Sequence, residues 1–291
     1  MNRPLALACA LLCASVAVSS ACLAQSANLV RFTLEPGHND REKIHGNFQQ
    51  DRDHQGHEQW STGFPPSDLI GLEVSSFRGP GARPIHFTIV REAGRLDCSG
   101  SGGGGRARGD CRFTMDPGFA HLLAAHGIGT PSDRQAFGLM AVNARREMIE
   151  AIAAAHYPTP SMDNLMALAA LGVDGRYIAE LSRAGYRPSS IQKLIEFKAL
   201  AITPQWIAGF VNVGYANVPG DGLVQLKALG ITPEFIAGYQ RIGYRNLPVN
   251  TLVELKALDI TPDFVRRAVP AGQPLPSVGH LEELKMFSDR H

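Results

Sequence analysis

Residues 226–235 read LKALGITPEF, and related phrases stand 29 residues later as LKALDITPDF (255–264) and 29 residues earlier as FKALAITPQW (197–206). A phrase that keeps its spacing while its letters vary indicates a structural unit repeated along the chain. Apolar residues keep the same phase far beyond this phrase. They are Leu165, Leu194, Leu223, Leu252 and Leu281, then Leu168, Phe197, Leu226, Leu255 and Leu284, then Leu171, Leu200, Leu229, Leu258 and Phe287.

Each unit predicts two short helices. The spacing of Leu223, Leu226, Leu229 and Ile231 gives the first helix one apolar face. A Thr-Pro pair then predicts the N-cap and first turn of a second helix, and a glycine eight residues after the following aromatic predicts its end. The glycines are Gly185, Gly214, Gly243 and Gly272. One such hairpin cannot bury its apolar face alone, so the copies are expected to stack as a small α-solenoid.

The phase extends back to Asp116-Pro117-Gly118-Phe119, so the array is predicted to span residues 116–291. Within it, Leu194, Leu223 and Leu252 are expected to form one continuous core. The repeated aromatics expected to join that core are Trp206, Phe235 and Phe264.

The N-terminal part of the chain has a different pattern. Short segments of alternating polarity predict strands at residues 29–35, 58–64, 69–77 and 84–92, whereas the polar stretch 37–60 is interpreted as mostly loop. These segments predict a small antiparallel sandwich or curled sheet over residues 25–115. The predicted fold class is therefore α+β, with this β domain followed by an all-α array of helical-hairpin repeats.

Residues 1–24 combine Arg3, an apolar run and small residues, a pattern typical of a secretory signal peptide cleaved after Ala24. The apolar run is too short for a transmembrane anchor, and we expect no other membrane segment. A lipoprotein attached through Cys22 is the alternative, although Ser19 stands where a lipobox has leucine. The mature protein is expected to be periplasmic or secreted.

Three of the five cysteines lie in this leader, which leaves Cys98 and Cys111. In an oxidising compartment such a pair is expected to form a disulfide. The glycine-rich segment between them, residues 99–110, is interpreted as the flexible loop of a β-hairpin whose ends the disulfide joins.

The chain contains 28 Lys and Arg against 27 Asp and Glu, and Arg3 leaves with the leader. A balanced charge argues against binding to nucleic acid or to an anionic membrane surface. The sequence contains neither an HExxH nor a GxSxG motif. We therefore expect no catalytic residue and no cofactor, and a hydrolase with an unrecognised site is kept as a third class of function.

One polar cluster could bind a metal. His45, His54, His57 and Glu58 offer ligands suited to zinc or copper, so a small-molecule- or metal-binding protein that uses residues 38–58 is the alternative function. The other interpretation of this segment is an ordinary polar loop.

In the array, Lys198, Lys227, Lys256 and Lys285 share one phase, so stacking predicts a row of lysines. The row is either a solvated face or a docking stripe for an acidic partner. The tyrosines that follow the glycines form either a binding ridge or contacts with the next repeat. They are Tyr186, Tyr215 and Tyr244.

The units at residues 223–251 and 252–264 resemble the repeats in the extracytoplasmic tails of membrane metallopeptidases of the beta-lactam-sensor antirepressor type. The segments WSTGF, LIGLEV, IHFTIVREAGRLDC and PGFAHLLAAHGI resemble the β segment that precedes those repeats, so the similarity covers about residues 55–287. The sequence lacks the transmembrane helices and zinc motif of that family. The resemblance therefore implies the fold, a periplasmic or secreted location and a binding role, but no protease activity.

Together these patterns predict a non-enzymatic binding protein whose helical array contacts another envelope or extracellular protein.

Overall fold

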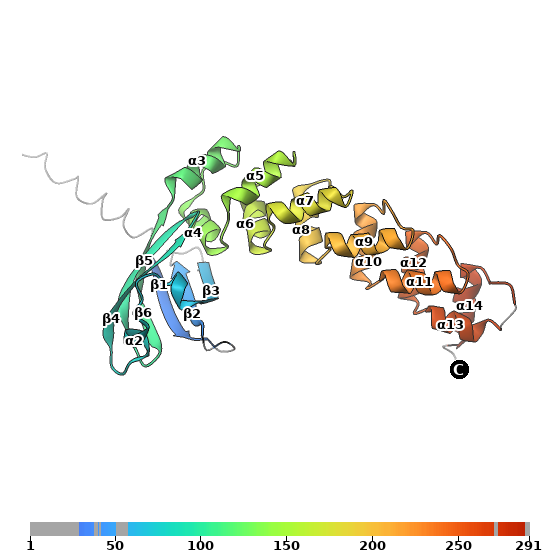
Figure 1. Cartoon of the computed structure of the whole chain (residues 1–291), viewed down its shortest axis with the longest axis horizontal. Coiled ribbons are helices and arrows are strands. Elements are labelled where there is room, and N and C mark those ends of the chain that lie inside the picture. The colour runs from blue at the N-terminus through green and yellow to red at the C-terminus, as the bar shows by residue number, and fades with distance from the viewer. Residues whose placement is uncertain (1–28, 38–39, 41, 51–57, 271–272, 289–291) are drawn as a thin grey trace, which may run out of the picture. The chain divides into compact units, whose positions relative to one another are not determined.

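The computed structural model describes residues 29–37, 40, 42–50, 58–270 and 273–288, which form an antiparallel sheet followed by twelve helices (Figure 1). The predicted leader, residues 1–24, lies outside the described residues. Two compact units divide near residue 144: the first holds the sheet with helices α3 and α4, and the second holds helices α5 to α14. The strands give way to helices between Met115 and Pro117, close to the predicted boundary, but the first two helices belong to the unit of the sheet.

The six strands are hydrogen-bonded in the order β3-β2-β1-β6-β5-β4, and every pair is antiparallel. The α+β fold class is thus confirmed. The strands are β1 (Leu29–Pro36), β2 (Ile44–Gln50), β3 (Glu58–Phe64), β4 (Arg83–Arg91), β5 (Gly94–Gly103) and β6 (Arg106–Met115).

Two strand predictions were wrong. Strand β2 lies in the stretch interpreted as loop, where Ile44 and Phe48 are buried and the polar residues between them face outward. The predicted strand at residues 69–77 is replaced by a single bridge and two short helices, η1 (Pro66–Asp68) and α2 (Val74–Arg78). Only Ile70 pairs there, with Thr88, because the chain turns at Gly71 (φ 86°).

The sheet is strongly curled around an aromatic core. Phe32 on β1 and Phe87 on β4 have ring centroids 4.9 Å apart, although two strands separate β1 from β4 in the sheet. Phe48 on β2 lies on the same buried face, with its ring 6.4 Å from that of Phe32. The apolar positions of the alternating strands therefore meet in the concave interior, as the curled-sheet interpretation predicts.

Helices close opposite ends of the β5–β6 hairpin. Near the end of β6, the ring of Phe137 from α4 (Asp133–Ala141) packs 5.9 Å from that of Phe113. Arg91 stacks over Trp60 and donates hydrogen bonds to the last carbonyls of α4, at Met140 (2.8 Å) and Ala141 (2.7 Å). At the hairpin turn, the amides of residues 104 and 105 donate to carbonyls at the end of α2. The preceding helix is α3 (Pro117–Ala125).

Cys98 and Cys111 form a disulfide, as predicted, but the segment between them is not a loop. The two cysteines face each other in the β5–β6 ladder, and pairing continues beyond them to Gly103 and Arg106. Only Gly104 and Gly105 form the turn, and both have positive φ (62° and 80°), which suits a two-residue hairpin. The disulfide therefore joins two strands within the sheet.

The helices of the second unit recur with the period of the repeated sequence phrase. The first helix in each pair of this unit begins at residues 146, 175, 204, 233 and 262, and the second begins at 162, 191, 220, 249 and 278. Helices α3 and α4 begin one period before α5 and α6, which confirms that the phase starts near residue 116. The helices are α5 (Arg146–Ala154), α6 (Met162–Ala170), α7 (Gly175–Arg183), α8 (Ile191–Ala199), α9 (Pro204–Asn212), α10 (Gly220–Ala228), α11 (Pro233–Arg241), α12 (Val249–Ala257), α13 (Pro262–Ala268) and α14 (Val278–Ser288).

The predicted capping chemistry is confirmed. The Thr232 hydroxyl accepts a hydrogen bond from the Phe235 amide, with Pro233 in the first turn, and the same cap recurs at α9 and α13. Gly214 and Gly243 follow the ends of α9 and α11 with φ of 89° and 104°. These are the left-handed conformations that glycine adopts without steric cost.

Equivalent helices of successive repeats pack on each other. The odd-numbered helices α5 to α13 form one row of contacts, and the even-numbered helices α6 to α14 form a second row. Leu194, Leu223 and Leu252 are fully buried, as predicted. Leu229, on the predicted apolar face of its helix, is instead 37 % exposed. The repeated aromatics border the core and are only half-buried, with Trp206 packed on the buried Phe210 and Phe235 on the buried Tyr239. The half-buried aromatics are Trp206, Phe235 and Phe264.

Candidate protein-binding surface

Each of the four repeated lysines lies over an aromatic ring that precedes it in the chain. Each lysine lies in an even-numbered helix, in the last turn of α8, α10 and α12 and further from the end in α14. Each ring lies in the first turn of the odd-numbered helix that comes before it. The distances from Nζ to the ring centroid are 4.4 Å for Lys198 and Tyr177, 5.0 Å for Lys227 and Trp206, 5.2 Å for Lys256 and Phe235, and 5.4 Å for Lys285 and Phe264.

Local structure fixes both partners of each pair. The Thr-Pro cap places the ring in the first turn of its helix. At the other helix, the carbonyl of Lys227 accepts a hydrogen bond from the Gly230 amide, and the carbonyl of Leu226 accepts one from Ile231. This is the Schellman closure of a helix, and it recurs after Lys198 and Lys256.

The ring explains why a cation recurs at this position. A cation over an aromatic face contributes about 0.5–1 kcal/mol at an exposed site, and neither glutamate nor glutamine can make this contact. Packing therefore gives a physical reason for the positive charge that the sequence alone did not supply. It leaves the outer side of each half-buried lysine accessible.

Exposed apolar side chains accompany the lysines. Two residues after its lysine, each of the last three repeats has a side chain that is substantially exposed. These are Leu229 (37 %), Leu258 (44 %) and Phe287 (64 %). We call the surface made by Lys198, Lys227, Lys256 and Lys285, with the residue two positions after each, the lysine stripe. The exposed apolar groups therefore recur along the stripe with the period of the repeat.

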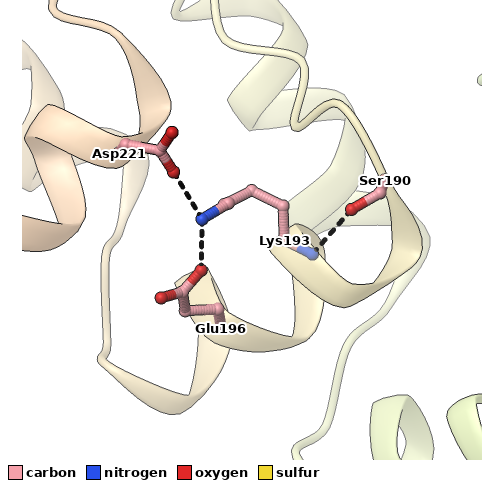
Figure 2. Close-up of polar contacts among 4 residues, drawn as sticks. All are labelled: Ser190, Lys193, Glu196 and Asp221. Carbon is pink, nitrogen blue, oxygen red and sulfur yellow. Dashed lines mark hydrogen bonds and ion pairs between the residues drawn. The ribbon is translucent and has the colours of Figure 1, made fainter.

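Lys193, which lies outside the lysine stripe, differs from the stripe lysines because its charge is paired with two carboxylates. Its ammonium lies 2.5 Å from Glu196 and 2.7 Å from Asp221, so it joins α8 to α10, while its amide donates to Ser190 (Figure 2). The carboxylate of Asp221, followed by that of Glu196, raises the pKa of Lys193. Within the described ranges, Lys198, Lys227 and Lys256 have no such ion pair.

The tyrosines that follow the glycines contact the next repeat, as the second of the two interpretations predicts. The hydroxyl of Tyr215 donates a 2.6 Å hydrogen bond to the carbonyl of Leu247, and that of Tyr244 donates one of the same length to Pro276. Burial raises the pKa of both hydroxyls. At the equivalent position, the Tyr186 hydroxyl is close to the Val218 backbone but does not reach regular hydrogen-bond geometry.

The proposed metal ligands are not brought together by the described residues. His45 pairs with Gly63 at one end of the β2–β3 ladder, where its ring lies 2.9 Å from the Ser61 hydroxyl. Glu58 pairs with Gln50 at the other end, about 17 Å away at the rise of a strand. His54 and His57 lie outside the described residues. Among those described, no group of three or more His, Cys, Asp or Glu could hold a metal ion.

Comparison with models of known protein families gives no match, and comparison with curated proteins gives none either. The resemblance to the sensor tails therefore stays a prediction. Across the described part of the chain, no single helix has the length and apolar composition of a membrane span. Helices α8 and α9 meet that test only when taken together across an 83° bend.

Proposed function

We propose that the chain is a non-enzymatic binding protein whose repeat helices dock another protein through the lysine stripe. One observation supports this proposal most strongly. In consecutive repeats, an ammonium group lies over an aromatic ring and an exposed apolar side chain follows two residues later. A solvated face would need the charge but not the apolar side chains.

The chemistry of the stripe favours a partner that combines acidic and apolar groups. Lys198, Lys227 and Lys256, which have no ion pair among the described residues, attract carboxylates over a long range and speed association. Burial of Leu229 and Leu258 would slow dissociation. The ring beneath each ammonium restricts the lysine before binding, so less side-chain freedom is lost when the complex forms.

The place of action is proposed to be the cell envelope or the extracellular space. A buried disulfide between Cys98 and Cys111 supports export, because such bonds persist in oxidising compartments. The leader pattern of residues 1–24 supports the same location.

A capture experiment tests the proposal. The full chain is immobilised and exposed to periplasmic extract, in parallel with the variants K227E/K256E and K227R/K256R. A matched control, R183E/R267E, makes the same change in net charge at two exposed arginines outside the stripe. We expect one protein to bind the parent, the arginine variant and the control, but not K227E/K256E. Capture by all four chains, or loss with the control as well, would show that the stripe is not the docking surface.

A further inference from the structure

The lysine stripe repeats at a regular distance, and this distance restricts the conformation of a segment that follows it. Helices α8, α10, α12 and α14 pack in succession, each against the next, and each carries one stripe lysine (Figure 1). The axes of packed helices lie about 8–10 Å apart, so the lysines recur across the helices at about that distance. A segment that contacts every repeat must therefore return a side chain to the same face about every 8–10 Å.

The regular chain conformations differ in whether they meet this condition. A polyproline II helix has three residues per turn and a rise of about 3.1 Å, so every third side chain returns to one face after about 9.3 Å. Three residues of a β-strand cover about 10 Å, but the third side chain points to the opposite face. An α-helix returns to one face after about 5.4 Å and, over seven residues, after about 10.5 Å. Polyproline II thus matches both the distance and the face.

Aromatic rings of the stripe suit the same conformation. Trp206, Phe235 and Phe264 are half-buried, so each ring reaches the surface beside the lysine that lies over it. Grooves lined by aromatic rings bind proline-rich segments, and such segments are already close to their bound conformation before they bind. The rings therefore recur with the period that a polyproline II helix presents.

Positive charge is greatest at the Lys198 end of the stripe. The exposed Arg176 directly precedes the ring under Lys198, and neither residue has an ion pair among those described. Lys227 likewise has none. The third repeat brings in two exposed acids, Glu234 and Asp259, which offset its lysine. The first two repeats are therefore the ones that favour carboxylates of a partner.

Exposed apolar surface increases toward the other end. The side chain two residues after the lysine is half-buried at Leu200 and is 37 % exposed at Leu229, 44 % at Leu258 and 64 % at Phe287. Apolar side chains of a partner would bury the most surface at the last two repeats. The stripe thus has a charged end and an apolar end.

We propose, as an extension that rests on the docking function above, that the partner docks through a proline-rich segment in the polyproline II conformation. Every third side chain of the segment faces the stripe. Two consecutive facing positions are acidic and contact Lys198 and Lys227, and the next two are apolar and contact Leu258 and Phe287. Such a segment covers the four repeats with about ten residues, because three turns of polyproline II advance about 28 Å.

Binding of a labelled synthetic peptide to the full chain, followed by fluorescence anisotropy, tests the proposal. The peptide has glutamate at its first and fourth positions, leucine at its seventh and tenth, and proline at all others. One comparison peptide moves the second glutamate and the second leucine one position earlier, which takes them off the common face. The other is an alanine-rich helical peptide with the same four residues at seven-residue intervals. We expect saturable binding of the first peptide and affinity at least about tenfold weaker for both comparison peptides.

Variants of the protein locate the peptide on the stripe. K198E/K227E and L258S/F287S should each weaken binding about tenfold. K198R/K227R keeps the charge, and R183E/R267E makes the same change in net charge as K198E/K227E at exposed positions outside the stripe. Both should bind the peptide as the parent does.

Several results would overturn the proposal: no saturable binding of the first peptide, equal binding of either comparison peptide, or parental affinity in both K198E/K227E and L258S/F287S. These two variants alter different repeats, so a folding defect in one leaves the other informative. If the peptide fails to bind but capture from periplasmic extract still depends on the stripe, the polyproline II segment is refuted and the docking function stands. Failure of both experiments refutes the docking function as well.

Discussion

At one position of the repeat, two substitutions should change the free energy of unfolding in opposite directions. The residue after each even-numbered helix cap adopts a left-handed conformation, with φ of 67° at Gly172, 52° at Ala201, 63° at Gly230 and 50° at Asp259. At Ala201 and Gly230 the amide donates to the lysine carbonyl three residues earlier. Ala201 and Gly230 therefore occupy equivalent positions. Replacing Ala201 by glycine and Gly230 by alanine makes the same exchange in opposite directions.

The expected magnitude follows from the backbone. A left-handed conformation costs an L-residue with a Cβ about 1–2 kcal/mol. Glycine loses about 0.5–1 kcal/mol more conformational freedom on folding than alanine does. A Cβ at Gly230 would have no heavy atom within 4 Å, so no steric clash adds to the balance. We expect A201G to raise the free energy of unfolding by about 0.5–1 kcal/mol and G230A to lower it by a similar amount.

Urea unfolding of the parent and both variants, monitored by circular dichroism, measures these changes. The slopes of the transitions should remain equal, so that the shifts in midpoint report stability. A lower midpoint for A201G, or a higher one for G230A, would refute the assigned helix closure.

Three further predictions concern the core and the stacking of the repeats. Leu223 is fully buried, so L223A should lower the free energy of unfolding by about 2–5 kcal/mol, and an unchanged midpoint in urea would contradict the stacked core. Alanine normally favours a helix over glycine by about 1 kcal/mol, but a Cβ at Gly209 would lie 2.9 Å from Pro233 Cγ. G209A should therefore lower the thermal midpoint, whereas G279A, with open space around it, should not. Burial, with a smaller contribution from Tyr244, raises the pKa of Tyr239, so the stability that its neutral hydroxyl provides is present below about pH 10 and is lost as the pH rises further. Unfolding followed from pH 8 to 12 should show a smaller alkaline loss for Y239F, and an identical loss would exclude this cause.

The sequence predicts the repeat well because its signals are local. A constant period, a Thr-Pro start and a glycine stop each act within one helical hairpin, and the helices begin where this phase places them. Leu229 shows the limit of periodicity. It shares the spacing of Leu223 and Leu226, yet it lies at the helix cap, where the chain turns away from the core and leaves the side chain exposed.

The sheet was harder to predict because its pairing partners are distant in sequence. Strand β2 has only two large apolar residues, Ile44 and Phe48, so its polar composition resembles a loop. The glycines of β5 and β6 suggest flexibility, but a Cβ at Gly109 would lie 2.2 Å from the Ser99 carbonyl oxygen. The close approach of β5 and β6 therefore requires glycine at this position. This requirement becomes visible only when the pairing of the two strands is known.

The sequence predicts that the four lysines form a row, but it does not predict that each lysine lies over an aromatic ring. The pairing of Lys227 with Trp206 depends on how two helices of one repeat pack, which the phase of the lysines does not reveal. The aromatics at the start of α9, α11 and α13 were the available signal, and they were assigned to the core instead.

Association kinetics with the captured partner test the docking function most directly. Association and dissociation rates are measured for the parent, K227E/K256E and L229S/L258S at low and moderate salt. If the stripe docks the partner, the lysine variant associates at least about tenfold more slowly at low salt, and the difference shrinks as salt screens the charges. The leucine variant should instead dissociate faster. Parental rates for both variants at both salt concentrations would contradict the proposed docking surface.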